Sequence, residues 1–154
     1  MIANTVCRTP LGNLLLSCDR NALTAARFIE DEHAHVAANP LPPVLAQATS
    51  ALAAYFCGGE IDAHLPLAPA GTAFQQQVWA AIARVRRGTT VTYLDIATEI
   101  GAPRSVRAVG AATGRNPLCI FIPCHRIVGR GGALTGYAWG LERKRALLER
   151  EAGA

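Results

Sequence analysis

The first part of the chain alternates short apolar runs with turn-forming residues. The segments TVC, LLLSC and LTAARF lie within residues 1–28, and the turn signals TPLGN and DRN separate them. Short apolar runs bounded by Gly, Pro, Asn and Asp are typical of strands. The pattern predicts a small antiparallel meander, followed by a histidine- and proline-containing loop over residues 31–43.

An alanine-rich segment and a proline-containing segment come next. Residues 44–57 (VLAQATSALAAYFC) predict a helix that stops at Gly58-Gly59, because glycines end helices. Residues 61–71 hold two prolines and a glycine and predict a linker. We therefore expect an N-terminal domain over residues 1–70 and a C-terminal domain over residues 71–154.

The second half of the chain has helical periodicity. Residues 74–85 (FQQQVWAAIARV) carry apolar side chains at helical spacing. The segment TYLD, residues 92–95, resembles a capping box with Asp in place of Glu or Gln, and it opens a short helix that stops at Gly101. A second helix is predicted over 103–113, with a proline in its first turn. Two short helices joined by a tight turn predict a helix-turn-helix.

The helix over 103–113 has two unlike faces. Val106, Val109, Gly110 and Thr113 recur at intervals of three and four residues and predict an inward stripe. The opposite face combines cations, which hold phosphates, with small residues, which let a backbone approach a groove. Its members are Arg104, Arg107, Ala108, Ala111 and Arg115. The alternative is a solvated face that carries helix-forming alanines.

The end of the chain predicts a buried strand, a hairpin and a helix. CIFI, within LCIFI at 118–122, predicts a buried strand, and RIV and ALT on either side of residues 129–132 predict a hairpin. Residues 140–151 (GLERKRALLERE) predict a final helix. Four of its side chains share one face, which we expect to point inward: Leu141, Lys144, Leu148 and Glu151.

Composition limits the class of protein. Hydrophobic residues make up 51% of the 154 residues and charged residues only 17%, which excludes a disordered chain. The longest apolar stretches are shorter than a membrane span, and the first ten residues lack the basic and apolar segments of a secretory signal. We expect a cytoplasmic protein without a membrane segment.

Charge is distributed unevenly along the chain. Residues 1–70 hold three of the 15 basic side chains and six of the 11 acids, so the remaining twelve basic side chains lie in residues 71–154. Fourteen of the basic side chains are arginine. A basic half-chain suggests a polyanion as partner, although ordinary surface charge explains the counts equally well.

The five cysteines do not form a disulfide pattern. Their number is odd and no CxxC pair occurs, which argues against a disulfide framework in a chain without a signal. A zinc site is the alternative, but none of its candidate ligands has zinc-finger spacing. These candidates are Cys7, Cys18, His33, His35 and His64.

The segment IPCHR carries the candidate chemistry. A thiol becomes a nucleophile when a base or a positive environment lowers its pKa, and His125 and Arg126 directly follow Cys124. Glu151 lies on the inward face of the last helix, where a half-buried carboxylate needs a partner. His125 is a suitable partner, which gives a Cys-His-Glu relay. The alternatives are a structural Cys-His pair, a solvated Glu151 and a structural role for Arg126.

Five blocks, in order, carry a family resemblance. FQQQVWAAI, TYLDIA, RSVRAVGAATGRNP, IPCHRIV and GYAWGLERKRALLE together resemble the O6-alkylguanine-DNA alkyltransferases, also called methylated-DNA–protein-cysteine methyltransferases. The match covers about residues 74–151, and TPLGNLLLS and AYFCGG add a looser match within 1–70. The resemblance implies an α/β (α+β) fold: a ribonuclease-like N-terminal domain with a small sheet, and a mostly helical, winged-helix-like domain that contains the helix-turn-helix.

The resemblance also implies a role for each matching catalytic position. Cys124 is similar to the thiolate that accepts the alkyl group from O6 of guanine and keeps it as a thioether. His125 resembles the water-mediated general base, and Glu151 the carboxylate that orients it. Asn116 resembles the asparagine that braces the active-site turn, and Tyr93 the phenol that hydrogen-bonds guanine N3 and helps the base leave as a neutral species.

DNA and substrate contacts are implied in the same way. Arg107 resembles the arginine finger that replaces the extruded nucleotide, in a helix-turn-helix that binds the minor groove of double-stranded DNA with little sequence preference. The exposed face of this helix itself predicts further DNA contacts at Ala108, Ala111, Arg104 and Arg115, and Arg130 is a further candidate for a phosphate contact. Tyr137, Ala138, Trp139 and Ile127 would line the guanine pocket. We expect irreversible, stoichiometric repair of O6-alkylguanine and O4-alkylthymine by a monomer, with no cofactor and no metal.

Two positions depart from the family pattern. Ala138 stands where some relatives have serine, and Trp139 stands where others have glycine. The indole should narrow the mouth of the alkyl pocket, so we expect slower reaction with benzyl-sized adducts than with methyl.

Other classes of protein remain as alternatives. A non-catalytic alkylated-base-binding protein that recruits repair factors would lack a cysteine at position 124. A cysteine hydrolase needs an oxyanion hole, which the sequence does not identify. A transcriptional activator would need a sensor or activation domain beyond the repair module.

Overall fold

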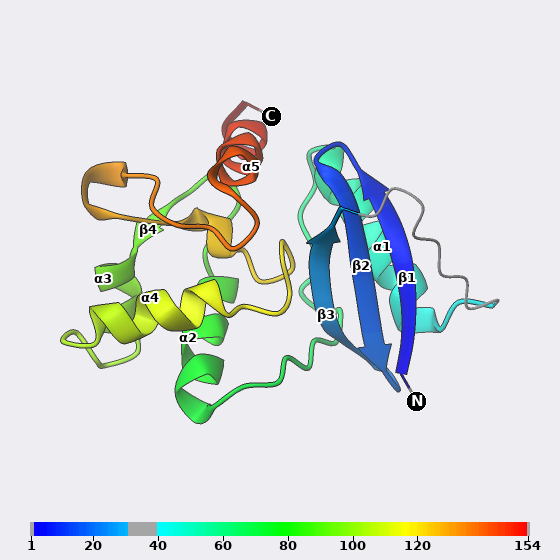
Figure 1. Ribbon diagram of the computed structural model, residues 1–154, viewed down its shortest axis with the longest axis horizontal. Helices are drawn as coiled ribbons and strands as arrows, with labels where there is room; N and C mark the ends of the chain where they lie inside the picture. The colour runs from blue at the N-terminus through cyan, green and yellow to red at the C-terminus, as the bar shows by residue number, and fades with distance from the viewer. Residues whose placement is uncertain (1, 31–39, 154) are drawn as a thin grey trace. The chain divides into compact units, whose positions relative to one another are not determined.

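The chain divides into two compact units. The computed structural model describes residues 2–30 and 40–153 (Figure 1). One unit comprises Met1–Ala70 and Pro117–Cys119, and the other comprises Gly71–Asn116 and Ile120–Ala154. Most of the predicted loop over 31–43, including His33 and His35, lies outside the described residues.

The first unit is a three-stranded sheet with one helix packed on it. β1 (Ile2–Thr9), β2 (Gly12–Asp19) and β3 (Ala22–Ile29) pair antiparallel in the order β1-β2-β3, which confirms the predicted meander. Alternate residues of β2 are buried, as a sheet with one covered face requires. The helix α1 (Pro43–Phe56) lies across that face (Figure 1) and contributes buried Val44, Leu45, Ala48, Leu52 and Tyr55.

Two short segments attach to the outer edge of β3, and both correct the sequence analysis. The predicted linker over 61–71 is bonded to the sheet, because Leu23 N–H donates to Pro66 O at 2.9 Å and Ala68 N–H to Leu23 O at 2.8 Å. The predicted strand CIFI is buried but is no strand. Leu118 forms an isolated bridge with Ala26, and the chain then turns at Ile120, where φ is +72°. These two segments thereby cover the outer edge of β3, which would otherwise present unpaired backbone groups.

Three helices pack together in the second unit. α2 (Ala73–Ala83) begins with a capping box between Thr72 and Gln75, which the sequence analysis missed. α3 (Tyr93–Glu99) begins with the predicted capping box of Thr92 and Asp95. It ends in a Schellman motif in which Gly101 adopts φ +78°.

The next helix begins later than predicted. α4 (Val106–Gly114) starts three residues after Pro103, which lies in the preceding turn and not in the first turn of the helix. The reason is that Ala102 closes α3 through its N–H and accepts a bond from Ser105 N–H at 2.9 Å, so the backbone turns there. The predicted inward stripe is confirmed at Val109 and Thr113, joined by buried Ala112. α3, the turn and α4 form the predicted helix-turn-helix.

The predicted hairpin around residues 129–132 is wrong. β5 (Ile127–Val128) pairs parallel with β4 (Val91–Thr92), while the 3₁₀ turn η2 (Arg130–Gly132) closes with Gly129 N–H donating to Ala133 O at 2.8 Å. Residues 133–137 form no strand, so β5 has no antiparallel partner after the turn.

The last helix, α5 (Leu141–Gly153), confirms the predicted inward positions of Lys144 and Glu151 but not that of Leu141. Its buried residues are Lys144, Leu147 and Glu151, and Leu141 is exposed. Leu147 therefore replaces Leu141 and Leu148 as the apolar member of the face. Within residues 2–30 and 40–153, none of the helices is both long and apolar enough to cross a membrane.

Candidate active site

A tight turn at the end of a buried segment presents Cys124. Pro123 has φ −79° and ψ 64°, and Cys124 N–H donates to Ile122 O at 2.7 Å, which is the geometry of an inverse γ-turn. The left-handed Ile120 precedes this turn; for a β-branched residue that conformation costs about 1–3 kcal/mol. Burial of Ile120, which is only 2% exposed, holds the backbone in this shape.

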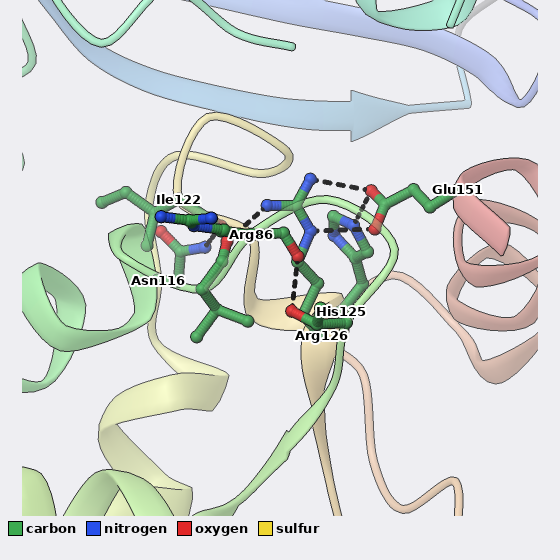
Figure 2. Close-up of polar contacts among 8 residues, drawn as sticks. Arg86, Asn116, Ile122, His125, Arg126 and Glu151 are labelled. Atoms are coloured by element: carbon green, nitrogen blue, oxygen red, sulfur yellow. Dashed lines mark hydrogen bonds and ion pairs between the residues drawn. The ribbon is translucent and has the colours of Figure 1, made fainter. Parts of the chain in front are cut away.

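The side chain of Asn116 holds the turn through two hydrogen bonds. It lies two residues beyond α4, and its Nδ2 donates to Ile122 O at 2.8 Å and to Cys124 Sγ at 3.1 Å (Figure 2 shows the first of these bonds). The same amide therefore fixes the backbone before the cysteine and the position of its sulfur.

Cys124 is buried, which makes its thiolate costly. Its residue surface is 3% exposed, and burial raises the pKa of the Cys124 thiol to about 11, against the lowering effects of the Asn116 bond and the Lys144 charge. At neutral pH the group is a thiol, so its reaction requires a base that removes the proton.

His125, the next residue in the chain after Cys124, offers a basic ring nitrogen. Burial lowers the pKa of His125, against the opposing effect of Glu151, so its imidazole is neutral at neutral pH. Its Nε2 lies 2.6 Å from Glu151 Oε2. Figure 2 shows Glu151 reaching from α5 toward both His125 and Arg126.

Arg126 fixes the charge of Glu151. Its Nε donates to Oε1 at 2.8 Å and its Nη2 to Oε2 at 3.0 Å, while its Nη1 donates to Val85 O at 2.7 Å. A carboxylate held in this way only accepts hydrogen bonds, so the proton of the neutral imidazole is on Nε2. Nδ1 of His125 then carries the free lone pair, and it has no hydrogen-bond partner among the described residues.

Lys144 is a buried cation that the sequence analysis placed on the inward face but gave no role. Its Nζ donates to the carbonyl oxygens of Ile127, Thr135 and Gly136 at 2.6, 2.9 and 3.3 Å. Burial lowers the pKa of Lys144, and the nearby Cys124 opposes that shift. In the sequence, the position of Lys144 on one helix face with apolar residues was the feature that pointed to a buried lysine.

Three of the four predicted pocket residues lie in the loop before α5, and the fourth, Ile127, lies in β5. Ile127 is fully buried, Ala138 is exposed, and the rings of Tyr137 and Trp139 meet edge to face with centroids 5.4 Å apart. The Tyr93 hydroxyl accepts a hydrogen bond from Thr135 Oγ1 at 3.3 Å. Like Lys144, Thr135 was given no role from the sequence, because no local sequence pattern connects Thr135 with Tyr93.

The predicted DNA-contacting residues share the exposed side of the helix-turn-helix. All five of them are exposed, and four lie on α4 or directly at its end: Arg107, Ala108, Ala111 and Arg115, with Arg104 in the preceding turn. Arg130 is also exposed, in η2.

The part of the chain that the structure describes holds no group of three His, Cys, Asp or Glu side chains arranged to bind a metal ion. His33 and His35, two candidate zinc ligands, are outside that part.

Comparisons with known proteins cover both units. A family model described as 6-O-methylguanine DNA methyltransferase, ribonuclease-like domain, matches residues 2–69, and one described as the DNA binding domain of the same enzyme matches residues 73–153. The methylated-DNA–protein-cysteine methyltransferase of Mycobacterium tuberculosis is 43% identical over 145 residues, which cover 93% of this chain and 88% of the relative. The constitutive enzyme of Bacillus subtilis is 39% identical over 150 residues, with 94% and 91% covered.

Solved structures agree. The crystal structure of Mycobacterium tuberculosis O6-methylguanine methyltransferase matches with a TM-score of 0.86 and 39% identity, covering 99% of this chain and 94% of that one. A crystal structure of Mycobacterium tuberculosis OGT in complex with DNA matches with a TM-score of 0.86 and 40% identity, covering 97% and 92%.

Proposed function

The chain belongs to the methylated-DNA–protein-cysteine methyltransferase family, and on that premise we propose that Cys124 is the thiol that accepts the alkyl group. The protein is an O6-methylguanine DNA methyltransferase that repairs DNA by alkyl transfer to a cysteine. The observation that carries the assignment of Cys124 is its placement: a buried sulfur held at 3.1 Å by Asn116, next in sequence to a neutral histidine.

The thiol proton leaves through His125. The free lone pair on Nδ1 supports this step, because it is the only basic position that the imidazole offers once Glu151 holds Nε2. One water molecule bridging Sγ and Nδ1 would complete the relay, as a general base acts through direct contact or a single water. Glu151 then stabilises the imidazolium, and Arg126 keeps Glu151 ionised.

The alkyl group moves in one displacement. The Cys124 sulfur forms a bond to the alkyl carbon while the bond from that carbon to O6 breaks, and the electron pair of the broken bond stays on guanine. The Tyr93 hydroxyl donates a proton to N3, so that the base leaves neutral. The product is a thioether, which the described residues offer no means of reversing, and each molecule therefore reacts once.

The DNA partner follows from the exposed face of α4. Binding through the minor groove of double-stranded DNA suits the small Ala108 and Ala111, which permit close approach, and Arg104 and Arg115, which contact phosphates. Arg107 fills the space of the nucleotide, which must be extruded because a buried thiol cannot reach O6 inside a duplex. Phosphate contacts carry no sequence information, so we propose little sequence preference.

Three broader features complete the proposal. O4-alkylthymine, which presents its alkyl oxygen similarly, is a second substrate. The protein acts as a monomer, since one chain supplies every residue of the relay. A cytoplasmic location suits a protein whose described cysteines are all free thiols, because that compartment keeps thiols reduced.

Intact-protein mass tests the assignment of Cys124. After incubation with duplex DNA containing O6-methylguanine, the wild type should gain one methylene unit per molecule and no more, and Cys124→Ala should gain nothing. Cys119→Ala, which removes another buried thiol, is the matched control and should gain the same mass as the wild type. No gain by the wild type, with DNA binding intact, would point to the non-catalytic alkylated-base-binding protein.

A further inference from the structure

The hydroxyl of Thr135 contacts Tyr93 from the loop before α5. Thr135 Oγ1 donates to Tyr93 Oη at 3.3 Å. This is longer than an ordinary O–H···O bond, as catalytic hydrogen bonds often are before substrate binds. Since Tyr93 Oη is the acceptor, its own proton stays available, and no described residue accepts it.

Lys144 fixes the backbone of Thr135. The Thr135 carbonyl accepts from Lys144 Nζ at 2.9 Å, and the same ammonium also holds Ile127 and Gly136. Lys144 is fully buried, so these three carbonyls replace the water that its charge would otherwise need. Thr135 is therefore anchored although its side chain is exposed.

Gly129 fixes the side-chain rotamer of Thr135. A Cβ added at position 129 would lie 3.1 Å from Thr135 Cγ2, so the threonine methyl packs directly over the glycine backbone. A β-branched side chain has few χ1 states, and placing its methyl also places its hydroxyl. With the methyl on Gly129, the hydroxyl faces Tyr93.

We propose that Thr135 is a positioning residue for alkyl transfer, which holds the Tyr93 oxygen as an acceptor so that the Tyr93 proton is directed to the leaving base. The inference rests on the proposed role of Tyr93. As the C–O6 bond breaks and its electron pair moves onto guanine, the Tyr93 proton passes to N3 and leaves a phenolate. The Thr135 hydroxyl then donates to that phenolate, and a charged acceptor strengthens the bond.

The first test compares two variants of Thr135. Thr135→Val keeps the shape and the β-branch but removes the donor, and it should slow transfer from O6-methylguanine in duplex DNA about tenfold. Thr135→Ser keeps the donor and should stay within about twofold of the wild type. Equal rates for Thr135→Val and the wild type would refute the inference.

A double-mutant cycle separates positioning of Tyr93 from support of the loop. In the Tyr93→Phe background there is no hydroxyl to position, so adding Thr135→Val should slow transfer no further. A full additional loss there would show that Thr135 acts on the loop and not on Tyr93, and would overturn the inference. Gly129→Ala, which displaces the threonine methyl, should likewise slow transfer only when Tyr93 is present.

The cycle also distinguishes failure of the inference from failure of the proposed function. If Tyr93→Phe transfers at the wild-type rate, the proposed role of Tyr93 is wrong and the inference falls with it, while the mass gain at Cys124 still reports alkyl transfer. If Tyr93→Phe is slow but Thr135→Val is not, the role of Tyr93 stands and only the inference fails.

Discussion

The side-chain amide of Asn116 lies 3.1 Å from the sulfur of Cys124 and donates a hydrogen bond to it. The same nitrogen holds the Ile122 carbonyl at 2.8 Å, so one side chain couples the shape of the γ-turn to the charge of the sulfur. The bond strengthens when the thiol loses its proton, because a charged acceptor binds the donor more tightly. Asn116 therefore opposes the effect of burial on the pKa of Cys124.

Asn116→Ala should raise the pKa of Cys124 above its value of about 11 and slow the reaction of this thiol with iodoacetamide about tenfold. The measurement is the rate at which the peptide containing Cys124 gains mass at fixed pH. Cys57 is exposed and serves as the internal control, whose rate should not change. An unchanged rate at Cys124 would show that the amide only shapes the turn.

Glu151→Gln should destabilise the protein by about 3–5 kcal/mol, because it leaves the buried Arg126 without its counter-charge. The matched control is Glu99→Gln. It breaks the pair with Arg84 at 3.1 Å, whose side chains are 61% and 44% exposed, and it should cost less than about 1 kcal/mol. Urea unfolding of both variants tests the contrast, and similar losses would contradict it.

Stability should depend on pH through His125. Burial lowers the pKa of His125 below 6.5, so below that pH the unfolded chain takes up a proton more readily than the folded protein does. The contribution is therefore present above pH 6.5 and is lost as pH falls through the folded pKa. The free energy of unfolding should decline less steeply below pH 6.5 in His125→Asn than in the wild type.

His64→Asn is the control for that measurement, since His64 is exposed. This variant shows how much of any change comes from the loss of a histidine as such. If His125→Asn leaves the slope of unfolding free energy against pH unchanged, the acid sensitivity comes from other groups.

Much of the fold could be predicted because it depends on local signals. The capping box of Thr92 and Asp95 and the strands within residues 1–28 need only neighbouring residues to form. The segment LCIFI and the residues around Gly129 were mispredicted because their partners are distant in sequence. Leu118 bridges Ala26, and Ile127 pairs with Val91, so tertiary contacts override the local preference for a strand or a hairpin.

The candidate site, like the fold, could be predicted from the sequence only where local patterns specify it. The helical period placed Glu151 and Lys144 on one inward face, so the sequence could predict a buried carboxylate there. It could not predict that Arg126 would bind both oxygens of Glu151, nor that Thr135 would contact Tyr93, 42 residues away. Such contacts depend on how the loop before α5 folds, which no local pattern specifies.

Arg107→Ala should slow repair of O6-methylguanine in duplex DNA much more than reaction with free O6-benzylguanine, because only the duplex requires a side chain in place of the extruded nucleotide. Arg104→Ala is the matched control, since it removes the same charge from the same exposed face. It should weaken DNA binding and lower the slope of log affinity against log salt concentration by about one. Its effect on the rate of transfer from bound duplex should be smaller. Equal losses for Arg107→Ala on both substrates would refute the finger assignment.

Trp139→Gly should speed the reaction with O6-benzylguanine and change the reaction with O6-methylguanine little. The indole of Trp139 meets the Tyr137 ring edge to face with centroids 5.4 Å apart, which fixes its bulk beside a residue proposed to line the guanine pocket. Trp139→Phe keeps an aromatic ring and is the control, with an expected rate close to the wild type. Single-turnover rates with both free bases give the selectivity, and an unchanged benzyl-to-methyl ratio in Trp139→Gly would show that the indole does not narrow the pocket.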